Sequence, residues 1–130
     1  MAYKDNIEQL TQHNENFRKV LYTAKFSQLV LMCLKPGEDA GEEMHYVDQF
    51  FRFEKGQGLA VIEGKEQKVG EGDGLVVSAG TKHNIINSSK SEPLKFYTIY
   101  SPPNHRDKTV HPTKQDAATD YEHFDGRTSE

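Results

Sequence analysis

Two glycine-bounded segments, residues 37–56 and 72–87, constrain the fold of this chain more than any other feature of its sequence. The first contains Glu43, His45 and Gln49. These three residues share one parity, so in an extended strand their side chains point to one face. The second contains a histidine that follows a turn flanked by glycine. We expect the two segments to lie side by side, with the residues between them forming a hairpin.

Four side chains of these segments are candidate metal ligands: Glu43, His45, Gln49 and His83. Imidazole nitrogens and side-chain oxygens that converge from several strands suit a borderline divalent ion. The alternatives are polar packing for the histidines, a solvated loop edge for Glu43, and a hydrogen-bonded buried amide for Gln49. If Glu43 and Gln49 both bind, the ligands carry one negative charge against +2. Such a site is net positive and attracts an anionic substrate.

The two segments resemble the two signature motifs of the cupin superfamily. The spacing of the family motifs is reproduced at every position of residues 37–56 and 72–87. Three identities depart from the motifs: Glu43 stands where the first histidine belongs, Gln49 where the glutamate belongs, and Ser78 where the proline belongs. Serine costs only turn rigidity, because Gly80 still supplies the backbone freedom that the turn needs.

The resemblance covers residues 17–101 and implies an all-β fold, the cupin double-stranded β-helix or jelly-roll barrel. The hydrophobic pattern outside the two motifs also predicts an all-β fold, because short apolar or alternating stretches recur about every ten residues between turn signals. We expect a tight hairpin at Gly64. The expected strands cover residues 17–23, 26–34, 49–55, 58–63, 67–69, 75–77, 83–87 and 94–100.

The chain ends are expected to flank the barrel as an N-terminal segment, residues 1–16, and a C-terminal extension with a mobile tail, residues 102–130. Each end is predicted to hold a short terminal helix. One lies within residues 4–12, and the other follows Thr113, a suitable helix cap, up to Ala118.

Side chains around the candidate site are expected to have packing roles. Phe51 and Phe53 share the parity of Gln49 and should pack the barrel behind the ion. His105 and His111 follow the barrel, and most loop histidines are solvated, so a surface loop is expected. Alternatively, this loop folds over the site and brings one of them to the substrate. No catalytic residue is assigned.

Composition narrows the class of protein. The 130 residues carry a net charge of −4 and a single cysteine, Cys33, which lies in an apolar run and is expected to be a buried thiol. The polar N-terminus and the lack of a long apolar run predict a soluble, cytoplasmic protein without a membrane partner. No basic stripe with aromatic residues occurs, so nucleic acid is not an expected partner.

A homodimer is expected from residues 50–53, which are apolar on both faces apart from Arg52. The outward face of this stretch must be covered either by another sheet or by a second subunit.

The resemblance also implies a function, a small cupin that binds one divalent metal ion (Zn, Mn, Fe or Ni) and a small-molecule ligand. The chain is similar to single-domain cupins described as mannose-6-phosphate isomerase-like, which implies a sugar or sugar phosphate substrate and proton transfer by a side-chain base. A phosphate site should show a glycine-rich loop at a helix N-terminus or clustered Arg and Lys, and none is clear. The alternatives are an iron-dependent dioxygenase and a non-catalytic small-molecule-binding module.

Overall fold

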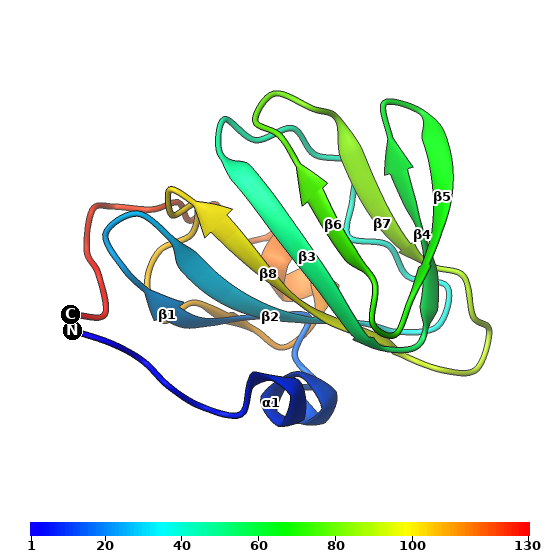
Figure 1. The fold of residues 1–130 in the computed structure, drawn as a ribbon, viewed down its shortest axis with the longest axis horizontal. Helices are drawn as coiled ribbons and strands as arrows, with labels where there is room; N and C mark the ends of the chain where they lie inside the picture. Colours follow the sequence, from blue (N-terminus) through cyan, green and yellow to red (C-terminus); the bar gives the residue numbers. More distant parts are fainter.

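The computed structural model describes all 130 residues and consists of nine strands and two short helices (Figure 1). The helices are α1 (Ile7–His13) and α2 (Lys114–Ala118), of 7 and 5 residues. The strands are β1 (Arg18–Thr23), β2 (Gln28–Leu34), β3 (Asp48–Lys55), β4 (Gln57–Ile62), β5 (Lys65–Gly70), β6 (Gly74–Val77), β7 (His83–Asn87), β8 (Leu94–Ser101) and β9 (Val110–His111). The predicted all-β class with short terminal helices is confirmed.

The strands form two antiparallel sheets, one of six strands in the order β6-β3-β8-β2-β1-β9 and one of three in the order β5-β4-β7. In Figure 1 the smaller sheet lies beside one end of the larger sheet, and both surround a common interior. All eight predicted strands are present, with bounds that differ by at most two residues. The two-residue strand β9 has too short a pattern to be predicted.

The hydrophobic core fills the space between the sheets. Alternate residues of β3 face it, so Gln49, Phe51 and Phe53 are buried as predicted from their shared parity. Cys33 is a buried free thiol, also as predicted. It lies on the outer face of the larger sheet, where α1 packs against β2, β3 and β8. This helix therefore covers part of the outward apolar face noted in the sequence.

Two turns show why glycine is required at particular positions. Residues Glu63 and Gly64 join β4 to β5 with φ of 49° and 79°, the left-handed pair that a two-residue hairpin needs. Gly56, which ends the first motif, has φ of 93°, and a Cβ atom there would lie 2.3 Å from the carbonyl oxygen of Pro93. The close passage of the backbone at Pro93 thus excludes any side chain at position 56.

Residues 102–130 return to the barrel after β8. Strand β9 pairs with β1, and Gln28 of β2 makes four hydrogen bonds, one to Thr23 and three to this segment. Three of these bonds join Gln28 to the backbone of Asn104 and His105. Helix α2 begins with a capping box in which Asp116 takes the place usual for Glu or Gln. None of the helices has the length and apolar character needed to span a membrane.

Candidate metal centre

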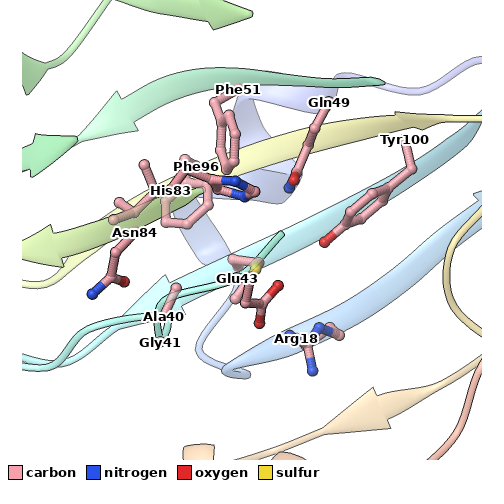
Figure 2. Close-up of a pocket in the computed structure, with 12 residues that line it drawn as sticks. Arg18, Ala40, Gly41, Glu43, Gln49, Phe51, His83, Asn84, Phe96 and Tyr100 are labelled. Atoms are coloured by element: carbon pink, nitrogen blue, oxygen red, sulfur yellow. The ribbon is translucent and has the colours of Figure 1, made fainter. Parts of the chain in front are cut away.

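A cavity lined by residues of both sheets lies between them and is called the cup below. Strands β3 and β8 contribute Gln49, Phe51 and Tyr100 to its wall, and β7 contributes His83 (Figure 2). The loop before β3 contributes Glu43. All four residues predicted as metal ligands lie in or beside this cup.

Three of these residues form a compact group of ligand atoms. One nitrogen or carboxylate oxygen from each of Glu43, His45 and His83 lies within 4.8 Å of the others. Two imidazoles and one carboxylate at this separation can bind one divalent ion. These three residues, together with Gln49, are called the ligand cluster below.

Glu43 and His83 are brought together by backbone pairing. They form an isolated antiparallel bridge, in which each residue accepts a hydrogen bond from the amide of the other. Directly opposed residues in such a pair have side chains on the same face. Glu43 and His45 precede β3, which begins at Asp48, so only Gln49 of the three lies in that strand. Exposure nevertheless alternates from residue 41 to 48, so the shared parity is kept.

The protonation of His83 follows from its contacts. Its Nδ1 lies 2.9 Å from the carbonyl oxygen of Thr81, and a carbonyl oxygen only accepts, so Nδ1 carries the proton. In the neutral ring, the other nitrogen, Nε2, then has a free lone pair. A hydrogen bond of this kind orients many metal-binding histidines. Phe51 packs edge-on against the ring at 5.9 Å between centroids, in the packing position predicted for it.

His45 and Glu43 are close enough to share an ion. His45 Nε2 is buried, lies 2.5 Å from a carboxylate oxygen of Glu43 and makes no hydrogen bond to any other group. Burial alone would raise the pKa of Glu43. The neighbouring His45 and the charge of Arg18 outweigh burial, so the pKa of Glu43 lies below its ordinary value. A carboxylate is therefore present at neutral pH.

Gln49 presents an unpaired oxygen inside the protein. Its Nε2 donates to the hydroxyl of Thr98 at 2.9 Å, while its Oε1 is buried without a partner. Buried polar atoms are nearly always hydrogen-bonded, and an exception calls for an unseen partner such as a water or an ion. The unpaired oxygen of Gln49, and the His45 nitrogen whose one polar contact is Glu43, fit a metal ion held by the ligand cluster.

A second group of polar side chains reaches the cup from residues 102–130. The surface position expected for His105 is wrong, because its ring is buried between Tyr100 and Glu122. The hydroxyl of Tyr100 lies 3.2 Å from His105 Nε2, and His105 Nδ1 lies 2.7 Å from a carboxylate oxygen of Glu122. These three residues are called the buried relay below.

The charges of the buried relay set the direction of its hydrogen bonds. Burial lowers the pKa of His105, although Glu122 opposes this shift, and the bond from His105 lowers the pKa of Glu122 despite burial. At neutral pH, Glu122 is ionised and accepts the Nδ1 proton, so His105 Nε2 accepts from Tyr100. Burial raises the pKa of Tyr100, which keeps its phenol protonated.

The surface position expected for His111 is also wrong. It is buried beside Arg18, its cross-strand partner on β1. Its Nδ1 lies 3.2 Å from Arg18 Nη1 and its Nε2 lies 2.9 Å from Asp120. A guanidinium only donates, so His111 accepts through Nδ1 and donates through Nε2.

Sequence reasoning missed Arg18, Asp120 and Glu122. The two acidic residues lie in a polar stretch without periodicity, and Arg18 stands at the start of an expected strand. One signal was present in the sequence. Arg18 lies two residues before Val20 in the expected strand, so both side chains point to the same, inward face. A charged residue on an inward face is unusual enough to mark a site.

Comparison with known proteins identifies relatives along most of the chain. YrkC of Bacillus subtilis is 47% identical over 120 residues, which cover 86% of this chain and 63% of YrkC. The protein L612 of Acanthamoeba polyphaga mimivirus is 46% identical over 108 residues, covering 80% of this chain and 68% of L612. The chain thus spans just under two thirds of YrkC.

A solved structure also matches the fold along most of the chain. The crystal structure of BH2720 from Bacillus halodurans has a TM-score of 0.89 at 38% identity, covering 92% of this chain and 96% of that one. A family model described as a cupin domain matches residues 30–100, which include both predicted motifs. These matches confirm the double-stranded β-helix implied by the motif spacing, and the chain belongs to the cupin superfamily.

Proposed function

We propose that this protein is a metal-dependent cupin that moves a proton on a small hydroxy or oxo compound. This is the isomerase-type reaction that the resemblance implies, there on a sugar or sugar phosphate. The observation that supports it most is the position of the buried relay. Its first member, Tyr100, lines the same cup as the ligand cluster.

The ligand cluster supplies donors that suit a divalent ion. Glu43 provides a charged oxygen, and the neutral ring of His83 provides a free lone pair on Nε2. His45 Nε2 has Glu43 as its one polar contact, and Gln49 Oε1 has no hydrogen-bond partner. A divalent ion bound there would polarise a substrate oxygen and stabilise negative charge that develops on it.

The buried relay can accept the proton that the substrate loses. The substrate O–H or C–H bond breaks, and its proton bonds to the Tyr100 oxygen. The original phenol proton moves to His105 Nε2, which becomes an imidazolium beside the Glu122 carboxylate. The phenol is therefore never ionised, which agrees with its raised pKa. Return of the proton to a neighbouring atom completes an isomerisation.

Solvent exchange tests this proposal. Metal-supplemented protein is incubated in D₂O with hydroxy aldehydes, hydroxy ketones and oxo acids, and deuterium next to the carbonyl is followed by NMR. We expect exchange with the wild type and a loss of at least about a hundredfold in Tyr100→Phe, a typical contribution of one acid–base group. Tyr97→Phe, on the outer face of the same strand, is the matched control. Equal exchange in Tyr100→Phe and wild type would contradict the role of the relay.

An iron-dependent dioxygenase is the second candidate, and one observation favours it. Two histidines and one carboxylate in a compact group are also the ligands of non-haem iron(II) oxygenases. Oxygen consumption by iron-loaded protein, without deuterium exchange, would support this candidate. Ligand stabilisation without exchange or oxygen consumption would instead support a binding module.

A further inference from the structure

Arg18 is a buried cation that makes no salt bridge, although its charge acts on the nearby carboxylates of Glu43 and Glu122. It is 8% exposed, and no salt bridge of the structure includes it. Arginine is almost never buried unless it is paired, because removing its charge from water is costly. A guanidinium without a salt bridge in the wall of a cup therefore favours an anionic ligand.

Only one edge of this guanidinium is used by the protein. Nη1 donates to His111, which is held in turn by Asp120. Nε is buried and has no partner, and Nη2 makes no hydrogen bond within the protein. Nε–H and an Nη2 proton form the side-on fork of an arginine, which matches the two oxygens of a carboxylate.

The charge in the cup agrees with an anionic ligand. Glu43 is the one carboxylate among the residues that line it, and a metal ion in the ligand cluster would take up that negative charge. Gln49 stands where the cupin motif has glutamate, and its neutral amide adds no negative charge. Glu122, whose pKa the charge of Arg18 also lowers, makes no salt bridge with it. The Arg18 guanidinium therefore has no contacting anion, beside a cluster that is itself net positive when it holds a divalent ion.

We propose that Arg18 binds the carboxylate of a small hydroxy or oxo acid through Nε and Nη2. The lining residues include no lysine and no second arginine, so one guanidinium faces the ligand. This favours a singly charged carboxylate over a phosphate ester, which carries about two charges. The inference deepens the proposed function, on which it rests for the reacting end of the ligand, and it assigns the substrate class as sugar acids or related acids.

The side-chain Nε–H signal of Arg18 in ¹⁵N–¹H spectra tests the inference directly. The chain has four arginines, and the Arg18 signal is the one that Arg18→Lys removes. We expect lactate to shift this signal in both metal-free and zinc-loaded protein, whereas neutral lactamide leaves it unchanged. Glycerol 3-phosphate should bind more weakly than lactate. No shift with lactate, or a preference for the phosphate, would overturn the proposal.

Two substitutions of Arg18 separate the effect of its positive charge from the effect of its two-pronged hydrogen-bonding geometry. Arg18→Met should weaken lactate binding at least about tenfold, and Arg18→Lys should recover only part of the loss, because lysine lacks the fork. Lys19→Met, at the exposed neighbouring position of β1, should bind lactate like the wild type. Far-UV circular dichroism and the zinc content of each variant show whether the fold and the ligand cluster are intact. Equal lactate affinity in folded Arg18→Met and wild type would contradict the inference.

The metal-free measurement also distinguishes this inference from the proposed function. Suppose that lactate binds to metal-free protein and that metal-supplemented protein shows no deuterium exchange. This result would support the role of Arg18 and contradict the proton-transfer reaction. Deuterium exchange in Arg18→Met at the wild-type rate and substrate affinity would support the proton-transfer reaction and contradict the role of Arg18.

Discussion

Glu43 and His83 exchange two backbone hydrogen bonds, with N–O distances of 2.8 and 2.9 Å. Their positions are therefore set by the main chain, and neither side chain is needed to hold the other in place. Two of the candidate metal ligands of the cup are thus held in place by backbone hydrogen bonds. Substitutions of these side chains should change what the cup binds while the surrounding sheets remain folded.

Gln49→Glu should tighten metal binding by about tenfold or more, which corresponds to ~1.4 kcal/mol. The new carboxylate adds negative charge next to a cation, and Thr98 can reverse its hydrogen bond and donate to it. Without metal, the same variant should be less stable than the wild type, because two carboxylates then share the cup. Titration calorimetry and thermal unfolding with and without metal measure both effects. Weaker metal binding by Gln49→Glu would exclude Gln49 from the ligand cluster.

Protonation of His105 should make the fold sensitive to mild acid. Burial lowers the pKa of folded His105, whereas the unfolded value is about 6.5. Below that pH the unfolded chain binds a proton that the folded chain does not, so the free energy of unfolding falls. Glu122, whose folded pKa is also lowered, adds a further loss below about pH 4.3.

His105→Gln should therefore flatten the dependence of the free energy of unfolding on pH between 7 and 5. His123→Gln, at an exposed position nearby in the chain, should leave this dependence unchanged. Urea titrations at a series of pH values provide the measurement. A wild-type slope in His105→Gln would contradict a buried neutral imidazole.

The contrast between the barrel and residues 102–130 shows what the sequence can predict. His83 and Asn87 were placed on the right strand because alternation and glycine turns are local signals. The burial of His105 depends instead on Gln28 and Glu122, which are 77 and 17 residues away in the chain. Such long-range contacts have no local pattern, so the expected surface loop was wrong. Gln49 was predicted from its strand parity and its motif position.

Gln28→Leu should destabilise the protein by about 3 kcal/mol, because buried amides of Asn104 and His105 lose their acceptor. The loss should also loosen the buried relay, so deuterium exchange of the substrate should slow. Gln67→Leu, on the exposed face of β5, is the control. Chemical denaturation gives the stability of both variants, and a change below about 0.5 kcal/mol in Gln28→Leu would contradict the role of this side chain.

A homodimer stays a prediction, supported by an apolar patch on the outer face of β3 and its neighbours. The rings of Phe50 and Tyr97 lie 6.4 Å apart, and Val76, paired with Phe50, is 70% exposed. Sedimentation at micromolar concentration should give twice the mass of the 14.8 kDa chain. Val76→Glu should restore the monomer, and Val110→Glu, on the opposite edge strand, should not. A 14.8 kDa species alone in the wild type would exclude the dimer.

Metal stoichiometry tests the central claim most directly. Elemental analysis of freshly purified protein, and of protein supplemented with zinc, manganese, iron or nickel, should find one divalent ion per chain. His45→Ala and His83→Ala should each lose most of it, and Glu43→Gln should lose less. Occupancy should fall as the pH drops below about 6.5, since metal-binding imidazoles must be neutral. A wild-type protein that holds no stoichiometric ion after supplementation would contradict the account, and the histidines of the cup would then be packing residues.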